Sequence, residues 1–435
     1  MGVDLHPSPV LGVTRAALAR GVAAAALAGL IACAALICLH AAGSGSHLVP
    51  AEWQGTPGWM SGPLPSVGAP LAGRTFGALF LAMCGCYAFA LVLVRHAEPR
   101  MVVAAIVLVH ALFLLAPPLL SADVFGYIDW ARIGAVHGLD PYSHGSLSAP
   151  HDPVFAYMRW RTHLPSPYGP LFTLGSYAIA PLSVAASLWV FKVAAALASL
   201  AIVWLVWDCA RRLEVAPLPA AMLVGLNPLV LVWAVGGAHN DLIVMAAVMT
   251  GVWLTVRGRE RAAGATLVAA AALKASAGVV LPFLIAGARR QRDALTAVVV
   301  AGAAVVAVSF AVFGPDLLHG MIGAQRIQQQ LVATASVPNQ VGAWLGFGGL
   351  TPAIRAVALA GFAIAFVTLL WRSWRGMDWL AAAGWATFAL LVTSAWLMPW
   401  YVVWLLPLAA LARDRRLAAA TLALCLYVVV MRTPL

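Results

Sequence analysis

Charged residues are scarce in this 435-residue chain. They make up 9% of it, whereas about 25% is typical of a soluble globular domain. Lysine is nearly missing, with only Lys192 and Lys274. So few charges cannot cover a water-facing surface, which excludes a cytosolic enzyme and a disordered protein. The six cysteines lie in or beside apolar runs, without metal-ligand spacing to histidine, which excludes a disulfide scaffold.

Apolar residues make up 63% of the chain. A helix rises about 1.5 Å per residue, and the hydrocarbon core of a bilayer is about 30 Å thick. The sequence therefore predicts an all-α polytopic transmembrane helix bundle of about 11–13 membrane helices, with outer-face loops and short re-entrant helices. Eleven apolar stretches are long enough to cross: 17–39, 75–94, 101–118, 185–208, 217–236, 241–257, 293–313, 352–371, 379–397, 399–412 and 417–431.

The net charge of +11 is largely a signal of orientation. Arginine and lysine concentrate in the cytoplasmic loops of membrane proteins, so the N-terminus is placed inside the cell. Seven arginine clusters then face the cytoplasm: Arg15/Arg20, Arg95/Arg100, Arg211/Arg212, Arg257/Arg259/Arg261, Arg289/Arg290/Arg292, Arg372/Arg375 and Arg413/Arg415/Arg416. The other arginines lie outside or at the outer boundary: Arg74, Arg132, Arg159, Arg161, Arg326, Arg355 and Arg432. The basic excess therefore does not indicate nucleic-acid binding.

This orientation makes the chain a single multi-pass membrane domain, residues 1–435, with outer loops at about 40–74, 119–168 and 314–351. Residues 262–288 begin and end on the cytoplasmic side, which predicts a re-entrant hairpin or two short crossings. Residues 169–183 are short and contain Pro181, so we expect them at the outer interface or dipping partway in. Non-helical backbone at membrane depth requires cover by protein or water, which indicates a cavity.

The segment SADVFGYIDWARIGAVHGLDPY (121–142) opens the longest outer loop. Asp123, Tyr127 and Trp130 fall on one face of a predicted helix, at i, i+4 and i+7. Ser121 can cap this helix, and an aspartate in the first turn suits the helix dipole. The spacing alone leaves two interpretations of Asp123 open, a helix-start acid and a functional carboxylate.

The same loop holds four histidines whose separations of seven, seven and twelve residues match no metal-ligand motif: His137, His144, His151 and His163. We therefore predict neither a metal nor another cofactor. Asp129 and Arg132, three residues apart, predict a local ion pair.

Two aromatic motifs lie at the outer face. In HLPSPYGPLF (163–172), three prolines stiffen the chain around Tyr168, which could pack on a sugar ring or be an ordinary interfacial tyrosine. MPWYVVW (398–404) is interpreted as an aromatic belt that anchors the chain at the interface.

GGAHNDLIV (236–244) joins two predicted membrane helices at the outer face. Its two glycines allow close approach of the backbone, and Asn240 can cap the following helix, whose free N–H groups can hold an anion. His239 faces the aqueous side near the predicted cavity, and Asp241 follows it. A tight turn with a capped helix is the alternative interpretation.

The two lysines both lie in apolar runs. ALKASAGVVLPF (272–283) places Lys274 among small residues, and a cation at a helix centre costs at least about 2.5 kcal/mol, so a partner is expected. A lipid phosphate is one such partner. We interpret Lys192 as structural, snorkelling along its helix.

The order of six motifs resembles the actinobacterial polyprenyl-phosphate-mannose-dependent α-1,6-mannosyltransferases of the GT-C glycosyltransferase superfamily. These motifs are DVFGYIDWARIGAVHGLDPY, PSPYGP, LNPLVL (226–231), GGAHND, ALKASAGVVLPF and MPWYVVW. The resemblance covers about residues 121–407 and implies a bundle of the GT-C type. It implies inverting transfer of mannose from a polyprenyl phosphate to a cell-envelope glycan or glycolipid, such as a lipoglycan, on the extracytoplasmic side of the cell membrane. It also implies that the first outer loop carries the essential aspartate, here Asp123.

The leaving lipid phosphate is good enough to need no general acid, so one carboxylate can take the acceptor proton while cations or helix-end N–H groups hold the phosphate. Besides Asp123, we expect the residues that bind substrate or lipid phosphate to be Tyr127, Tyr168, His239, Asn240, Asp241, Lys274 and Arg355. Two alternatives remain: a lipid-linked-sugar flippase or secondary transporter, and a polymerase or ligase of whole lipid-linked glycans. No acid falls mid-helix and no repeat is evident, both of which disfavour the transporter.

Overall fold

The chain is all-α in the computed structural model, which describes residues 9–43, 45–50, 57–67, 71–158 and 163–433. It is 75% helical, and no strand occurs within these ranges. The prediction of an all-α membrane bundle is confirmed. Arg159 and Arg161, expected at the outer boundary, and the side chain of Arg15 lie outside the described part.

The helices have these bounds: α1 (Pro9–Ala41), α2 (Gly73–Val92), α3 (Pro99–Leu115), α4 (Asp123–Ala135), α5 (Pro170–Ser176), α6 (Val184–Arg212), α7 (Pro217–Gly225), α8 (Asp241–Val256), α9 (Glu260–Leu273), α10 (Leu281–Gly287), α11 (Gln291–Phe313), α12 (Leu317–Gln330), α13 (Val337–Trp344), α14 (Pro352–Trp374), α15 (Trp379–Thr393), α16 (Leu406–Leu411) and α17 (Arg415–Arg432). A π-helix, η6 (Val230–Val235), and seven short 3₁₀ helices complete the set: η1 (Gly58–Met60), η2 (Val94–His96), η3 (Ser146–Ser148), η4 (Pro153–Tyr157), η5 (Tyr177–Ile179), η7 (Ala275–Val280) and η8 (Pro399–Trp404).

Local sequence explains where many helices begin. Proline stands at the first position of α3, α5, α7 and α14, where its fixed φ suits the helix and no N–H is needed. Ser183, Asp378 and Asp414 cap α6, α15 and α17 with side-chain oxygens that accept from backbone N–H groups.

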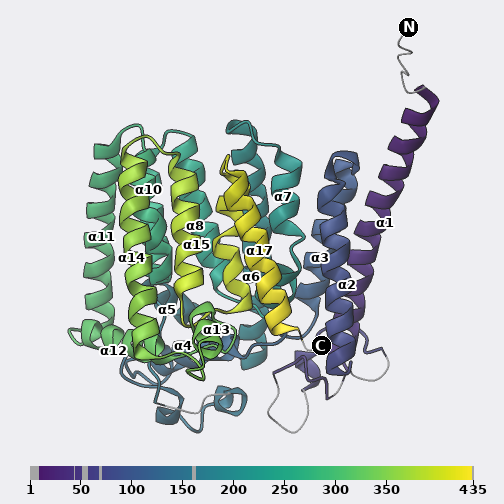
Figure 1. Cartoon of the computed structure of the whole chain (residues 1–435). Helices are drawn as coiled ribbons and strands as arrows, with labels where there is room; N and C mark the ends of the chain where they lie inside the picture. Colours follow the sequence, from purple (N-terminus) through teal and green to yellow (C-terminus); the bar gives the residue numbers. More distant parts are fainter. Residues whose placement is uncertain (1–8, 44, 51–56, 68–70, 159–162, 434–435) are drawn as a thin grey trace.

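Among the described residues, five helices are long and apolar enough to cross a membrane: Ala16–Ala41 within α1, then α2, α6, α11 and α14. Five shorter apolar helical segments accompany them: Pro99–Leu115, Asp241–Val256, Ala275–Gly287, Trp379–Thr393 and Pro399–Leu411. The long helices stand roughly side by side in Figure 1, and α4, α5, α12 and α13 gather at one end of the bundle. These four lie in or border the predicted outer loops, so this end is the one where sequence reasoning expects chemistry.

The segment 262–288 forms the predicted hairpin. α9 ends at Leu273, Lys274 is extended (φ −156°, ψ 124°), and η7 and α10 continue the chain. Gly169 packs against this break and donates its N–H to the Leu273 carbonyl (3.0 Å). A Cβ at Gly169 would lie 2.1 Å from the Ala272 carbonyl oxygen, so only glycine fits.

Two irregular segments, 226–240 and 397–412, form the buried centre of the bundle. Pro228 interrupts the helical ladder after α7, and the Asn227 side chain takes over by accepting from the N–H groups of Leu229 (3.0 Å) and Val230 (3.4 Å). The rest of the chain surrounds both segments, so their irregular backbone is covered by protein, as a membrane interior requires.

Candidate active site

Asp123 is the first residue of α4, at the end of the bundle where the outer loops gather. Its N–H donates to Ser121 Oγ (3.2 Å), which fixes the first turn as the sequence predicts, although Ala122 occupies the capping position. Upstream, the N–H of Leu119 donates to the Gly236 carbonyl (3.0 Å). The Asp123 side chain is 40% exposed, so its carboxylate can reach a substrate.

The turn at 236–240 brings His239 to Asp123. Cβ atoms at Gly236 and Gly237 would lie 2.3 Å and 2.4 Å from the carbonyls of Val232 and Trp233, which accounts for both glycines. His239 Nδ1 lies 3.6 Å from Asp123 Oδ2. Residues 116 positions apart in the chain therefore meet at one point, and both were predicted site residues.

His239 is fully buried, and its ring stacks on Trp400 with centroids 3.7 Å apart and planes at 18°. Burial, and secondarily the charge of Lys274, lower the pKa of His239 well below its usual value. The ring is therefore neutral at pH 7. Neither ring nitrogen has a hydrogen-bond partner within the described residues.

Tyr127 and Asn240 lie directly beside this pair. The Tyr127 hydroxyl donates to Asn240 Oδ1 (3.3 Å) and accepts from the Asn240 N–H (3.4 Å). The predicted cap by the Asn240 side chain is therefore wrong, because Tyr127 takes its oxygen away from α8. The Tyr127 ring packs on those of Tyr168 (5.1 Å) and Phe172 (5.3 Å). Burial and the nearby Asp123 charge raise the pKa of Tyr127, which stays a neutral phenol.

Lys274 forms an ion pair with Asp241. Lys274 Nζ lies 2.7 Å from Asp241 Oδ1, and this oxygen also accepts a hydrogen bond from Trp404 Nε1 (2.7 Å). The rings of Tyr401, Trp404 and Tyr168 surround the ammonium at 5.1, 5.2 and 5.9 Å. The Lys274 side chain stays 17% exposed, and Asp241 is fully buried with Oδ2 unpartnered within the described residues.

The interpretation of MPWYVVW as an interfacial anchor is wrong. Trp400, Tyr401 and Trp404 are less than 10% exposed and lie in η8, inside the bundle. They contribute the ring under His239 and two of the rings around Lys274. The proline within this apolar run could have indicated that the segment is buried, because irregular backbone in a membrane protein must be covered by protein.

Arg355 is not brought to this cluster. It lies on α14 and donates to the backbone carbonyl of Gln329, at the end of α12. Within the described residues Arg355 forms no hydrogen bond or ion pair with Asp123, His239 or Lys274.

The outer loop contains a second polar cluster, with a pairing that the sequence did not predict. Arg132 pairs with Asp152 rather than with Asp129: its Nε lies 2.9 Å from both Asp152 oxygens, and His137 Nε2 lies 2.7 Å from Oδ2. Burial raises the pKa of Asp152, but hydrogen bonds from Arg132 and others outweigh this effect and lower it overall. Burial, and then repulsion by Asp152, raise the pKa of Asp129 to about 7. Asp152 is thus the charged carboxylate that pairs with Arg132 in this loop.

No group of three or more histidine, cysteine, aspartate or glutamate side chains within the described ranges could hold a metal ion.

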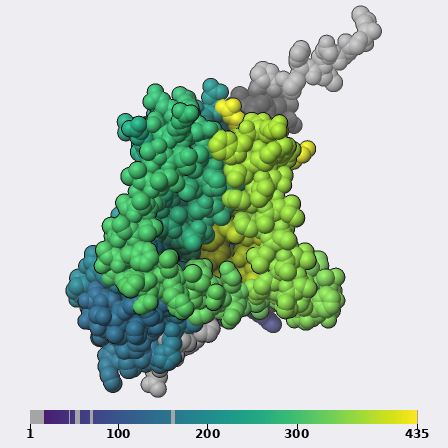
Figure 2. All heavy atoms as spheres, turned by 90° about the vertical axis from the view of Figure 1, so that its left-hand side faces the viewer, coloured from purple at the N-terminus to yellow at the C-terminus, as the bar shows by residue number. Residues whose placement is uncertain are grey.

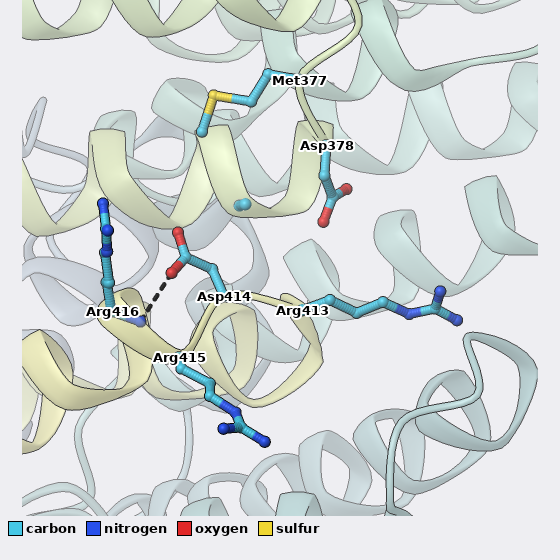
Figure 3. A pocket seen from close by; sticks show the side chains of 7 residues that line it. Met377, Asp378, Arg413, Asp414, Arg415 and Arg416 are labelled. Atoms are coloured by element: carbon cyan, nitrogen blue, oxygen red, sulfur yellow. Dashed lines mark hydrogen bonds between the residues drawn. The ribbon is translucent and has the colours of Figure 1, made fainter.

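A pocket of about 500 Å³ lies at the other end of the bundle, between the starts of α15 and α17. It is lined by Asp378 and Asp414, whose carboxylates cap those helices, and by Arg413, Arg415 and Arg416. The three guanidinium groups point in different directions in Figure 3 and do not converge on one ligand position.

Comparison with known proteins gives the family of the chain. The family described as "Alpha-(1->6)-mannopyranosyltransferase, N-terminal domain" matches residues 25–290, which include Asp123, His239 and Lys274. A second family, described as "MptB C-terminal domain", matches residues 331–435.

Two relatives carry the same description. Alpha-(1->6)-mannopyranosyltransferase A of Mycobacterium tuberculosis is 31% identical over 348 residues, which are 74% of this chain and 67% of the relative. Alpha-(1->6)-mannopyranosyltransferase B of Corynebacterium glutamicum is 28% identical over 343 residues, 69% of this chain and 57% of the relative. The matches thus span between just over half and two thirds of these relatives. With its first family match covering more than half of its length, the chain belongs to the alpha-(1->6)-mannopyranosyltransferase family of glycosyltransferases.

Proposed function

We propose that this protein transfers mannose from a polyprenyl-phosphate donor to a hydroxyl of a cell-envelope glycan or glycolipid, at the extracytoplasmic face, with inversion at the anomeric carbon. The observation that carries the proposal is the convergence of Asp123, His239 and the Lys274–Asp241 pair at one end of the bundle. An exposed carboxylate beside a caged cation is the pair of groups that displacement of a phosphate requires.

Asp123 acts as the general base. It takes the proton of the acceptor hydroxyl as that oxygen forms a bond to the anomeric carbon. The bond from this carbon to the phosphate oxygen breaks, and the phosphate leaves with the electron pair. A single displacement inverts the configuration. Because polyprenyl phosphate is a good leaving group, no second carboxylate is needed as an acid, in contrast to a glycosidase.

Lys274 holds the departing phosphate. Its side chain is partly exposed, whereas its partner Asp241 is buried, so the ammonium is the accessible half of the pair. Three aromatic rings fix its position and exclude water, which strengthens its field on a developing negative charge. The N–H groups at the start of α8 add a favourable dipole at the same point.

His239 serves the base rather than the phosphate. A neutral, buried imidazole supplies no positive charge, but its Nδ1–H can donate to the Asp123 carboxylate. The distance of 3.6 Å is longer than a hydrogen bond, as catalytic contacts often are before substrate binds. Stacking on Trp400 holds the ring plane toward Asp123. Tyr168, which is half-buried, offers aromatic surface beside the base for a sugar ring, and the buried Tyr127 packs against it.

The lipid tail has an apolar route to this site. α11 and α14 present their side chains outward, with 6% and 0% of their most apolar windows buried. Figure 2 shows the face between these two columns hollowed, with atoms of the C-terminal segment visible in its depth. A chain lying between α11 and α14 is the arrangement in which the phosphate would meet Lys274.

The side of the membrane follows from charge. The turns after α6, α8, α10 and α14 carry arginine clusters and belong to the end opposite Asp123, which we assign to the cytoplasm. The family relationship favours a transferase over the flippase or transporter alternative.

The deciding experiment compares Asp123→Asn with the wild type in membranes supplied with radiolabelled polyprenyl-phosphate mannose and a mannan acceptor. Loss of a general base lowers turnover about 10²–10⁴-fold, with normal insertion and yield. Asp293→Asn is the matched control and should keep wild-type turnover, because Asp293 lies on α11 in an ion pair with the exposed Arg261 of α9. Wild-type turnover by Asp123→Asn would refute the assignment. Counterflow of the lipid-linked sugar without glycan product would favour a transporter.

A further inference from the structure

Lys192 does not snorkel, contrary to the sequence interpretation. It lies in α6, and its side chain is fully buried. Its Nζ donates to the backbone carbonyls of Phe113 (3.0 Å) and Gly236 (3.3 Å). Within the described residues no carboxylate forms an ion pair with it. A buried cation is expensive, so its two acceptors need an explanation.

The first acceptor is a carbonyl that helix α3 leaves without an internal partner. The residue four positions after Phe113 is Pro117, which has no N–H to donate. Lys192 supplies the missing donor at the C-terminal end of α3. The lysine therefore anchors the point at which the chain leaves α3 toward Asp123.

The second acceptor belongs to the turn that carries His239. The Gly236 carbonyl also accepts from the Leu119 N–H (3.0 Å). Leu119 lies four residues before Asp123, and Gly236 lies three residues before His239. The Lys192 side chain thus joins α6 to the end of α3 and to the turn that carries His239. The Gly236 carbonyl joins this turn to Leu119, in the segment that leads to Asp123.

We infer that Lys192 is a positioning residue, which sets the Asp123 carboxylate against His239 by fixing the two backbone segments that carry them. It lies too deep to touch substrate and acts only through these segments. The inference rests on the proposed function, because it assigns Asp123 and His239 to one reaction. Small displacements of a positioned base are costly, since about 1 Å can lower the rate about 100-fold.

The test replaces Lys192 by methionine, which keeps its length and removes the donor. Ser199→Ala is the control, because it removes another buried hydrogen bond between α6 and α3, the one between Ser199 Oγ and His110 Nε2 (2.8 Å). We expect Lys192→Met to lower kcat about 10–100-fold and to leave the KM for polyprenyl-phosphate mannose within about twofold. Hydrogen exchange should quicken in residues 117–122 and 236–240 and stay unchanged elsewhere. Ser199→Ala should keep the wild-type kcat, KM and exchange rates in these two segments, because its hydrogen bond lies outside them. If Lys192→Met does not insert, Lys192→Leu, which also lacks a donor, gives the same comparison.

A double variant separates positioning from general stability. If both residues act on Asp123 through the same arrangement, Lys192→Met should cost much less kcat in a His239→Ala background than in the wild type. Additive losses, wild-type kcat, or unchanged exchange in both segments would overturn the inference. Failure of the proposed function is distinguishable from these outcomes, because Asp123→Asn would then be fully active.

Discussion

His239 Nδ1 lies 3.6 Å from Asp123 Oδ2, and the imidazole is fully buried against Trp400 while the carboxylate is 40% exposed. In the proposed reaction the two side chains have different roles: the buried ring orients the carboxylate, and the exposed carboxylate meets the acceptor. A neutral ring in this position adds no charge that would compete with Lys274 for the phosphate.

His239→Phe keeps a stacked aromatic ring on Trp400 but removes both nitrogens. We expect kcat to fall about 10–100-fold, which corresponds to the roughly 1.5–3 kcal/mol of a hydrogen bond to a charged group. The KM for the donor should barely change, because the neutral ring does not hold the phosphate. Steady-state kinetics on reconstituted protein check both values. A rise in KM with kcat intact would instead place His239 on the phosphate.

Lys274→Met leaves the buried Asp241 without its partner. Removing one member of a buried pair costs about 3–5 kcal/mol, so the melting temperature should fall markedly. In Lys274→Met combined with Asp241→Asn, most of that stability should return, while mannose transfer stays lost because the phosphate has no cation. Thermal unfolding and transfer assays on both variants separate the two effects. Activity in the double variant would show that another group binds the phosphate.

Gly169→Ala tests the contact between α5 and the α9 break. Its Cβ would lie 2.1 Å from the Ala272 carbonyl oxygen, and backbone cannot yield as a flexible side chain does. Overpacking of this kind costs about 1–3 kcal/mol, and here it also displaces Lys274. Gly175→Ala within α5, the helix that Gly169 precedes, is the control, because its Cβ would have no atom within 4 Å. Equal melting temperatures for the two variants would contradict the packing.

Asp129 should make the outer loop more stable in mild acid. Burial and Asp152 raise its native pKa to about 7, above the ordinary value near 4 of an unfolded aspartate. Between these values the native state binds more protons than the unfolded state, so this group adds stability as the pH falls from about 7 toward 4. Limited proteolysis of the loop at pH 5.5 and 7.5 should therefore show slower cutting at the lower pH.

Asp129→Asn should abolish this difference, because the amide does not titrate. Asp152 contributes in the opposite sense, since its lowered pKa gives stability that is present above about pH 4 and lost below it. Working above pH 5 therefore removes the contribution of Asp152, and the comparison with Asp129→Asn separates Asp129 from His137, which pairs with Asp152. A pH dependence that persisted in Asp129→Asn would assign the titration to another group.

The orientation is open to direct labelling. Cysteines placed at Ser143 in the outer loop and at Arg259 between α8 and α9 should react oppositely with a membrane-impermeant maleimide in intact cells. We expect labelling at position 143 alone, and at both positions after permeabilisation. The native cysteines are buried or half-buried, and the unsubstituted protein measures their background. Labelling at position 259 alone would invert the proposed topology.

The candidate site could be predicted in part from local patterns. The order of motifs singled out Asp123, Tyr127, Tyr168, His239, Asn240, Asp241 and Lys274, and contacts in the fold link them into one cluster. The predicted role of Arg355 stays a prediction: in the fold its guanidinium donates to the Gln329 carbonyl, a contact that the sequence did not indicate. Trp400 and Trp404 were missed because an apolar aromatic segment has the same composition inside a bundle and at a membrane interface.

The sequence by itself determined the all-α membrane bundle, and it predicted a hairpin or two short crossings over residues 262–288. The physical reason is that the length of an apolar run, the position of arginines and the presence of proline or glycine affect the local backbone and its place in the membrane. These effects do not depend on which distant residues pack nearby. Only the tertiary structure decided that Lys274 pairs with Asp241, that Arg132 pairs with Asp152, and that Lys192 turns inward to two carbonyls. A charge in an apolar chain must find a partner, but which partner depends on packing between segments far apart in the sequence.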